Sequence, residues 1–204
     1  MINIFLKSFP EFQRVAFEFG RPDFLDKSGL STQSASDMFW ALSKVVVHQQ
    51  LSGKVAKVFE DRLLNALGSV TPQNILGIGR ESLRALGLSN AKVSALLDLS
   101  TQVANKSLAL ESFRDMTDDE ITSRICMIFG FGPWSAHMFL LFEMGRIDVW
   151  APADLGVRKG FQLLYGLDTI PSILEMRSLQ TRYSPYSSLA TWYFWRVLEM
   201  EKPF

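Results

Sequence analysis

Apolar residues recur every three or four positions along most of this chain, a spacing that is typical of amphipathic α-helices. Residues that commonly begin a helix precede several of these segments, because their side chains accept hydrogen bonds from the first backbone N–H groups. These residues are Asp37, Ser52, Thr71 with Pro72, Ser89, Thr117 with Glu120, and Asp154, and the last long helix is expected from about Ser184. The pattern therefore predicts an all-α fold.

An almost uniformly apolar segment runs from Pro133 to about Met144, which predicts a helix at the centre of a domain. It follows the triplet Gly130-Phe131-Gly132. Two glycines around one apolar residue permit a tight turn, and N–H groups at the start of the next helix can bind a phosphate. Because glycine also ends ordinary helices, the triplet alone is weak evidence of function.

The composition indicates a folded protein with a substantial core, because 48% of the 204 residues are apolar. A chain of this length and apolar content can fold as one large domain or two small ones. No apolar stretch approaches the roughly 20 residues of a membrane span, and no export signal opens the sequence, so we expect a cytoplasmic protein without membrane contact. The segment from Gly20 to Ser36 is the most polar and turn-rich, which predicts an ordered loop or a boundary.

Charge and metal-binding residue types narrow the chemistry. The 21 basic side chains equal the 21 acidic ones in number, whereas proteins that bind many phosphates usually carry a basic excess. A protein that holds a few phosphates through backbone amides needs no such excess. Cys126 is the single cysteine, which excludes an internal disulfide and an all-cysteine cluster. We expect its side chain in the core. His48 and His137 are too isolated to form a metal pair.

Several motifs occur in an order that is more specific than the glycine triplet. The central ones read Ile128-Phe129-Gly130-Phe131-Gly132, Trp134-Ser135-Ala136 and Arg146-Ile147-Asp148-Val149-Trp150-Ala151-Pro152-Ala153-Asp154, and the flanking ones read His48-Gln49-Gln50-Leu51-Ser52, Leu86-Gly87-Leu88-Ser89-Asn90-Ala91-Lys92 and Pro185-Tyr186-Ser187-Ser188-Leu189-Ala190. In these motifs the chain resembles the helix-hairpin-helix DNA glycosylase superfamily, and within it the DNA-3-methyladenine glycosylase II branch. Two positions depart from the family pattern: Phe129 stands where the family has proline, and Ser187 where it has arginine.

The resemblance implies one glycosylase domain over residues 1–204, in a compact form without the N-terminal β domain of larger members. Two helical subdomains would flank a cleft. The central subdomain would span approximately residues 36–145 and contain the hairpin at 128–136. The second would combine residues 1–35 with residues 146–204.

Asp154 is an ordinary helix N-cap when judged by its position alone. The resemblance implies instead that it is the catalytic residue, at the mouth of the cleft. Breaking the bond between an alkylated base and its sugar builds positive charge on the sugar, which a nearby carboxylate stabilises. Trp134 stands where strand-cutting relatives carry a nucleophilic lysine, so the resemblance implies a monofunctional enzyme that uses water.

The resemblance also implies binding roles for other residues. Candidates for an aromatic pocket around the base are Trp134, Trp195, Tyr186, Phe39 and Trp40, for which core packing is the alternative interpretation. Candidates for DNA binding are Gln50, Leu51, Ser89, Lys92, Gly130, Phe131, Gly132 and Ser135. Gln50 or Leu51 would fill the gap left by a flipped nucleotide, although Gln49 and Gln50 would equally suit an exposed helix end. No catalytic metal or cofactor is expected, only a structural monovalent cation at Gly130–Gly132.

The function implied is removal of alkylated purines, chiefly 3-methyladenine and also 7-methylguanine, from double-stranded DNA by a monomeric enzyme, in the cytoplasm and at the nucleoid if the host is bacterial. One alternative is a DNA-binding module that recognises damage or structure without cleaving. Another is a helical protein unrelated to DNA, in which the glycine triplet is merely a cap.

Overall fold

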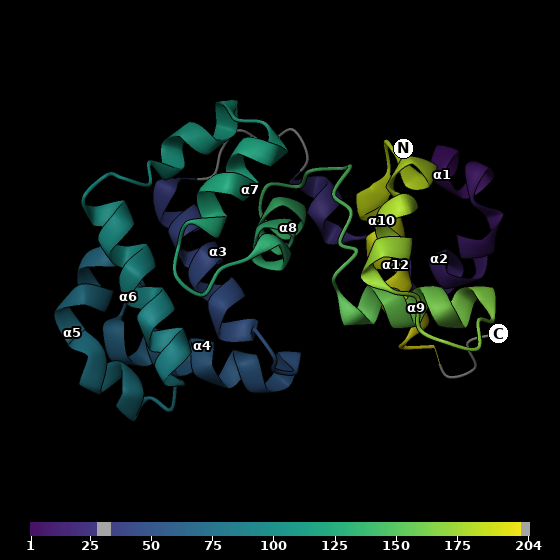
Figure 1. Ribbon diagram of the computed structural model, residues 1–204. Coiled ribbons are helices and arrows are strands. Elements are labelled where there is room, and N and C mark those ends of the chain that lie inside the picture. Colours follow the sequence, from purple (N-terminus) through teal and green to yellow (C-terminus); the bar gives the residue numbers. More distant parts are fainter. Residues whose placement is uncertain (28–33, 201–204) are drawn as a thin grey trace. The chain divides into compact units, whose positions relative to one another are not determined.

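The computed structural model describes residues 1–27 and 34–200, in which every regular element is a helix (Figure 1). The α-helices are α1 (Ile2–Ser8), α2 (Gln13–Phe19), α3 (Ala35–His48), α4 (Gly53–Leu67), α5 (Pro72–Ala85), α6 (Asn90–Ala104), α7 (Asp118–Cys126), α8 (Pro133–Phe142), α9 (Leu155–Tyr165), α10 (Ile173–Ser178), α11 (Gln180–Tyr183) and α12 (Ser187–Val197). Short 3-10 helices are η1 (Pro10–Phe12), η2 (Asp23–Asp26) and η3 (Leu110–Asp115). The all-α prediction is confirmed. None of these helices has the length and apolar character that crossing a membrane requires.

Helix starts follow the capping chemistry of the sequence. The side chains of Thr71, Ser89, Thr117 and Asp154 each accept a hydrogen bond from a backbone N–H group in the first turn of α5, α6, α7 and α9, respectively. Ser52 precedes α4 without such a side-chain bond. These side chains replace partners that the first N–H groups of a helix lack within the helix itself.

Two predicted helix starts are wrong. Helix α3 begins after Ser34, whose hydroxyl accepts from the N–H group of Asp37 at 3.1 Å, while the Asp37 carboxylate accepts from the N–H group of Ser34 at 2.9 Å. Asp37 is thus the third helical residue of a capping box rather than the cap. Helix α12 begins at Ser187 rather than near Ser184, because Ser184 precedes Pro185 and is held in an extended conformation.

The chain divides into two compact units. The terminal unit combines residues 1–29 with residues 140–204, and the central unit comprises residues 30–139. The predicted turn-rich segment from Gly20 to Ser36 contains η2, and its residues 28–33 lie outside the described residues. A cleft between two subdomains stays a prediction.

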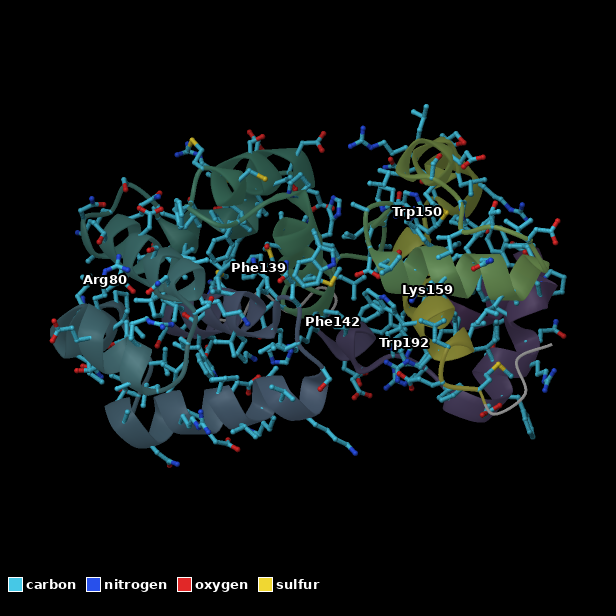
Figure 2. The ribbon with its side chains drawn as sticks, turned by 60° about the horizontal axis from the view of Figure 1, so that its bottom comes forward. Arg80, Phe139, Phe142, Trp150, Lys159 and Trp192 are labelled. Atoms are coloured by element: carbon cyan, nitrogen blue, oxygen red, sulfur yellow. The ribbon has the colours of Figure 1, made fainter. Side chains whose placement is uncertain are left out.

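The central unit has an aliphatic core. Helix α6 packs against α3 and α5, and α3 also packs against α4 and η3. The buried side chains include Leu42, Val46, Leu63, Ile75, Leu83, Val93, Leu96 and Leu99. Phe139 of α8 lies in this core, with its ring edge-on to that of Phe113 at 5.9 Å between centroids (Figure 2). The core fixes the helices from which the hairpin extends.

The terminal unit has an aromatic core around Phe194 of α12. Its ring centroid lies 5.1 Å from that of Phe12, 5.4 Å from that of Phe161 and 5.8 Å from that of Tyr183. The indole of Trp150 donates to the carbonyl of Met176 at 2.6 Å, so this buried polar atom has a partner. These rings hold α9 and α12 together.

Helices α9 and α12 approach most closely at Gly160. A Cβ atom added there would lie 1.9 Å from the carbonyl oxygen of Phe194, which is far inside van der Waals contact. The helices can cross at this distance only because residue 160 has no side chain.

We expect Gly160→Ala to destabilise the protein by about 3 kcal/mol, because the added methyl group must push two packed helices apart. Gly77→Ala is the matched control. Gly77 lies inside α5, and a Cβ atom there would meet nothing within 4 Å, so alanine should leave stability unchanged or raise it by about 1 kcal/mol. Chemical denaturation of the three proteins measures both effects. Equal stability of Gly160→Ala and wild type would contradict the tight crossing.

Candidate active site and nucleic-acid interface

The predicted hairpin is the connection between α7 and α8. Gly130 has a φ of +78°, in the left-handed region that favours glycine. A Cβ atom at this position would also lie 3.1 Å from the Cβ of Ala95 in α6. The N–H group of Phe131 closes the turn by donating to the carbonyl of Ile128 at 3.1 Å. Gly130 is therefore required both by its backbone conformation and by its close contact with α6.

Gln49, at the end of α3, connects to the hairpin from outside the motif. Its side-chain Nε2 donates to the carbonyl of Gly130 at 3.1 Å and to the hydroxyl of Ser135 at 3.1 Å. The next residue, Gln50, has a φ of +59°, which is uncommon for a residue with a side chain. Such a conformation costs on the order of 1 kcal/mol and persists where the surroundings hold it. The segment after α3 and the hairpin thus form one connected structure.

These two segments surround a hollow of about 350 Å³. It is lined by Gln49, Gln50, Gly130, Gly132, Trp134 and Ser135. The structure therefore brings together five of the residues selected from the sequence and adds Gln49. The sequence signal for Gln49 was its place in the His48–Ser52 motif, although its partners lie more than 80 residues away in the sequence.

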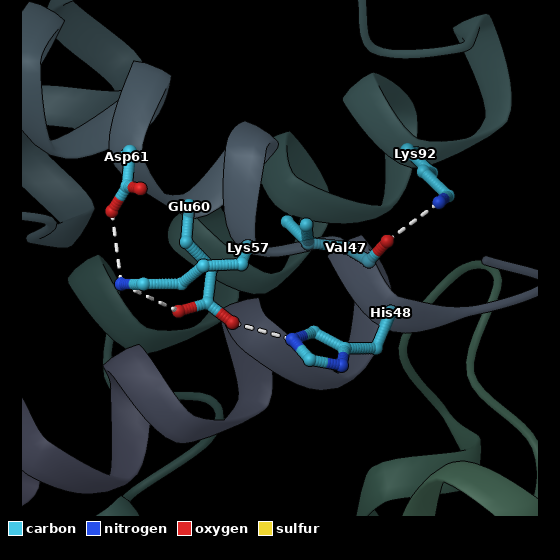
Figure 3. A network of polar contacts seen from close by, with 6 residues as sticks. All are labelled: Val47, His48, Lys57, Glu60, Asp61 and Lys92. Atoms are coloured by element: carbon cyan, nitrogen blue, oxygen red, sulfur yellow. Dashed lines mark hydrogen bonds and ion pairs between the residues drawn. The ribbon is translucent and has the colours of Figure 1, made fainter. Parts of the chain in front are cut away.

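Polar contacts hold the end of α3 from two sides (Figure 3). On one side, the imidazole of His48 contacts the Glu60 carboxylate of α4, which also lies 3.8 Å from the Lys57 ammonium. On the other side, Nζ of Lys92 in α6 donates to the carbonyl of Val47 at 2.6 Å. A cation favours a helix C-terminus because backbone carbonyls point there without intrahelical partners. Both contacts stabilise the helix end that carries Gln49.

Asp154, in the terminal unit, has two donors on one carboxylate oxygen. Its Oδ1 accepts from the N–H group of Val157 at 2.8 Å and from the indole Nε1 of Trp195 at 2.9 Å. The Trp195 ring stacks on Phe142, with 5.5 Å between centroids and 16° between planes. Asp154 is thus the N-cap of α9 and also binds the indole of Trp195, and its catalytic role stays a prediction.

Comparison with known proteins identifies the family. The family model described as HhH-GPD superfamily base excision DNA repair protein matches residues 43–185. The chain belongs to this superfamily. The match confirms the resemblance seen in the sequence and excludes the interpretation of the glycine triplet as a mere cap in an unrelated protein.

Individual relatives of this HhH-GPD protein are moderately similar. YfjP of Bacillus subtilis is 29% identical over 166 residues, which are 78% of this chain and 58% of YfjP. DNA-3-methyladenine glycosylase 1 of Schizosaccharomyces pombe is 27% identical over 163 residues, which are 78% of this chain and 72% of that protein. The solved structure of the 3-methyladenine DNA glycosylase Mag1 from Schizosaccharomyces pombe, in complex with abasic DNA, is similar with a TM-score of 0.82 and 25% identity. It covers 94% of this chain and 92% of the Mag1 chain.

Two residues predicted to bind DNA have structural contacts in this HhH-GPD chain. Ser89 caps α6, and the Lys92 ammonium is bonded to the carbonyl of Val47. Burial lowers the pKa of Lys92. The roles of Ser89 and Lys92 toward DNA stay predictions, as does that of the half-buried Leu51.

The other predicted pocket aromatics differ in exposure. Phe39 is 1% exposed, so it presents no free ring face to a base and the core-packing interpretation fits it. Trp40 is half-buried, with Nζ of Lys44 5.9 Å from its ring centroid. Tyr186 is half-buried and lies edge-on to Phe5, with 6.4 Å between centroids. Trp40 and Tyr186 stay candidates for contact with a base.

Ser187, where the family has arginine, lies inside the terminal unit and is fully buried. Its N–H group donates to Oδ1 of Asp148 at 3.2 Å, and its hydroxyl donates to the same oxygen. The hydroxyl of Ser184 donates to Oδ2 of Asp148 at 2.6 Å. Two small hydroxyl side chains therefore satisfy the Asp148 carboxylate.

Cys126 is half-buried, so its predicted place in the core is wrong. It is the last residue of α7, where the helix turns toward the surface loop, and partial burial raises the pKa of its thiol. His137 is mostly buried, which lowers the pKa of its imidazole. Over residues 1–27 and 34–200, no three His, Cys, Asp or Glu side chains form a cluster that could hold a metal ion.

Gly156 leaves the space that Trp195 occupies beside Asp154. A Cβ atom at residue 156 would lie 2.8 Å from Cδ1 of Trp195 and 3.1 Å from Oδ1 of Asp154. We expect Gly156→Ala to displace the indole and break its hydrogen bond to the carboxylate. The indole N–H resonance of Trp195, assigned with Trp195→Phe and ¹⁵N-labelled protein, should shift upfield in the variant. Gly77→Ala should leave it in place, and an unshifted resonance in Gly156→Ala would refute the steric argument.

Proposed function

We propose that this protein is a DNA glycosylase that removes alkylated purines, chiefly 3-methyladenine and also 7-methylguanine, from double-stranded DNA in base excision repair. The observation that carries the proposal is the Asp154 carboxylate, held by the Val157 N–H group and the Trp195 indole. Membership of the HhH-GPD superfamily and the likeness to Mag1 over most of both chains support it. The match covers only 58% of the length of YfjP, so the proposal concerns the 204 residues of this chain and not all that YfjP does.

Asp154 would act on the charge that develops during cleavage. As the bond between base and sugar breaks, positive charge builds on the sugar, and a carboxylate at a fixed position stabilises it electrostatically. The two donors on Oδ1 hold the carboxylate in one orientation, so little reorganisation is needed when the charge develops. The carboxylate would also orient the attacking water.

The leaving base needs no proton from the protein. An alkylated purine is already cationic and leaves as a neutral base, so a second carboxylate acting as general acid is not required. Ala153, directly before Asp154, agrees with this. Stacking of the flipped cationic base on an electron-rich ring such as Trp134 or Trp195 would favour alkylated over normal bases.

The hairpin would hold the DNA. Backbone N–H groups at the start of α8 suit a phosphate, a contact that fixes position without reading sequence. Gln50, on the rim of the same hollow, would fill the space left by the flipped nucleotide. Trp134 has no amine that could form a Schiff base with the sugar, so the reaction would end at an abasic site with the strand intact.

The remaining expectations concern partners and ions. We infer a monomer that acts on duplex DNA, in the cytoplasm or at a bacterial nucleoid, without a catalytic metal or cofactor. We also infer a structural monovalent cation at Gly130–Gly132, although two carbonyls there already accept hydrogen bonds. The carbonyl of Gly130 accepts from Gln49 and that of Gly132 accepts from the N–H group of Ala136 at 3.2 Å. Each carbonyl oxygen has a second lone pair that could bind a cation, whose role would be structural, so no step of the reaction is assigned to it.

Asp154→Asn tests the role of the carboxylate. Asparagine keeps an oxygen that can cap α9 and accept from Trp195 but removes the negative charge, so we expect base release to fall by about 100-fold or more with the fold intact. The measurement is chromatography of free 3-methyladenine released from methylated duplex DNA, together with the Kd for a duplex that contains an abasic-site analogue.

Asp168→Asn is the matched control, because Asp168 is an exposed carboxylate of the same unit, and it should release bases at the wild-type rate. Equal activity of Asp154→Asn and wild type would refute the proposed role. A wild-type protein that binds the duplex and releases no base would instead be a damage-binding module without catalysis.

A further inference from the structure

The hairpin has a second outside contact, which comes from α6. The backbone N–H group of Phe129 donates to Oδ2 of Asp98 at 2.7 Å. Nε2 of Gln102, one helical turn further along α6, donates to the same oxygen at 2.9 Å. Hydrogen bonds to an ionised carboxylate are shorter and stronger than those between neutral groups. Asp98 is therefore held on α6 and bonded to the hairpin backbone.

Asp98 lies on the face of α6 that adjoins the turn. Ala95, three residues earlier and on the same face, is the residue whose Cβ would be 3.1 Å from a Cβ at Gly130. Close packing at Ala95 and the hydrogen bond at Asp98 thus act on neighbouring residues of the hairpin. The side chain of Phe129 is 58% exposed, so side-chain packing contributes little to holding this residue.

The departure from the family pattern makes this contact informative. A proline at position 129 would fix the backbone dihedral φ and would carry no N–H group. Phe129 leaves φ free and adds a donor. The Asp98 carboxylate binds that donor and so restores a constraint at the same residue.

We propose that Asp98 is a positioning residue that holds the hairpin in the conformation that binds DNA, in place of the rigidity of a proline. This rests on the proposed function only in that the hairpin binds duplex DNA. With Gln49 on the carbonyl of Gly130, Asp98 fixes both sides of the turn. A turn that is already ordered loses less conformational entropy when it binds a phosphate, so it binds more tightly.

The negative charge of Asp98 and its hydrogen bond to the hairpin affect DNA affinity in opposite directions. A carboxylate near a bound phosphate weakens DNA binding, so a role as a mere surface charge predicts tighter binding when Asp98 is removed. A positioning role predicts weaker binding. The sign of the change therefore separates the two roles.

The test measures the Kd for a fluorescent duplex with an abasic-site analogue by anisotropy at one salt concentration. Asp98→Ala should raise the Kd about tenfold, because it removes a charge-assisted hydrogen bond. Asp98→Asn keeps an acceptor oxygen and removes the charge, so its Kd should equal that of the wild type or fall. Glu81→Ala, which removes an exposed carboxylate from α5 of the same unit, is the control and should not raise the Kd.

Phe129→Pro supplies the decisive comparison, because proline removes the donor that Asp98 binds. In this background, Asp98→Ala should change the Kd by less than twofold. A tenfold loss in both backgrounds would show that Asp98 acts elsewhere and would overturn the proposal. If Phe129→Pro does not fold, as judged by circular dichroism, the contrast between Asp98→Ala and Asp98→Asn still decides.

Base release separates this inference from the proposed function. A wild-type protein that releases bases, with Asp98→Ala binding DNA as tightly as wild type, would overturn the positioning role and leave the glycosylase proposal standing. A wild-type protein that releases no base but loses duplex affinity through Asp98→Ala, with Asp98→Asn unaffected, would support the positioning role alone. A wild-type protein with no affinity for the duplex would overturn it.

Discussion

The left-handed backbone of Gly130, packed against Ala95, is the constraint on which the central unit's candidate site depends. A side chain at residue 130 would be strained and would crowd Ala95, and without one α6 and the hairpin lie close enough for Asp98 to reach the Phe129 N–H group. The same turn directs the carbonyl of Gly130 toward Gln49. One backbone conformation therefore determines which neighbouring helices can contact the hairpin and where.

The terminal unit uses missing side chains in the same way. Gly160 allows α9 and α12 to cross at close range, and Gly156, one turn earlier, leaves room for the Trp195 indole beside Asp154. The carboxylate and its aromatic partner are thus brought together by two residues that have no functional groups. Helix packing therefore determines the geometry of this site, because a shift of α12 would move Trp195 away from Asp154.

The sequence was sufficient for features that depend on local chemistry. Apolar spacing predicted the helices, and capping residues such as Thr71 and Thr117 predicted most of their starts. The order of the motifs around Gly130 and Asp154 identified the family. The sequence was not sufficient to place the start of α3, because Ser34 and Asp37 can each serve as a cap and only the folded turn selects one. The exposure of the Phe39 and Cys126 side chains could not be predicted from the sequence either, because apolar periodicity does not show how deeply a helix is buried.

Pairings over long sequence distances could not be read from the sequence either. Asp148 with Ser187 is such a pair, and its burial limits which residues position 187 can accept. Ser187 is completely enclosed, so a guanidinium group introduced there would require volume that neighbouring side chains now occupy. A single Ser187→Arg substitution would therefore disrupt the packing around Asp148. Position 187 therefore accepts only a small side chain while its neighbours keep their present volumes.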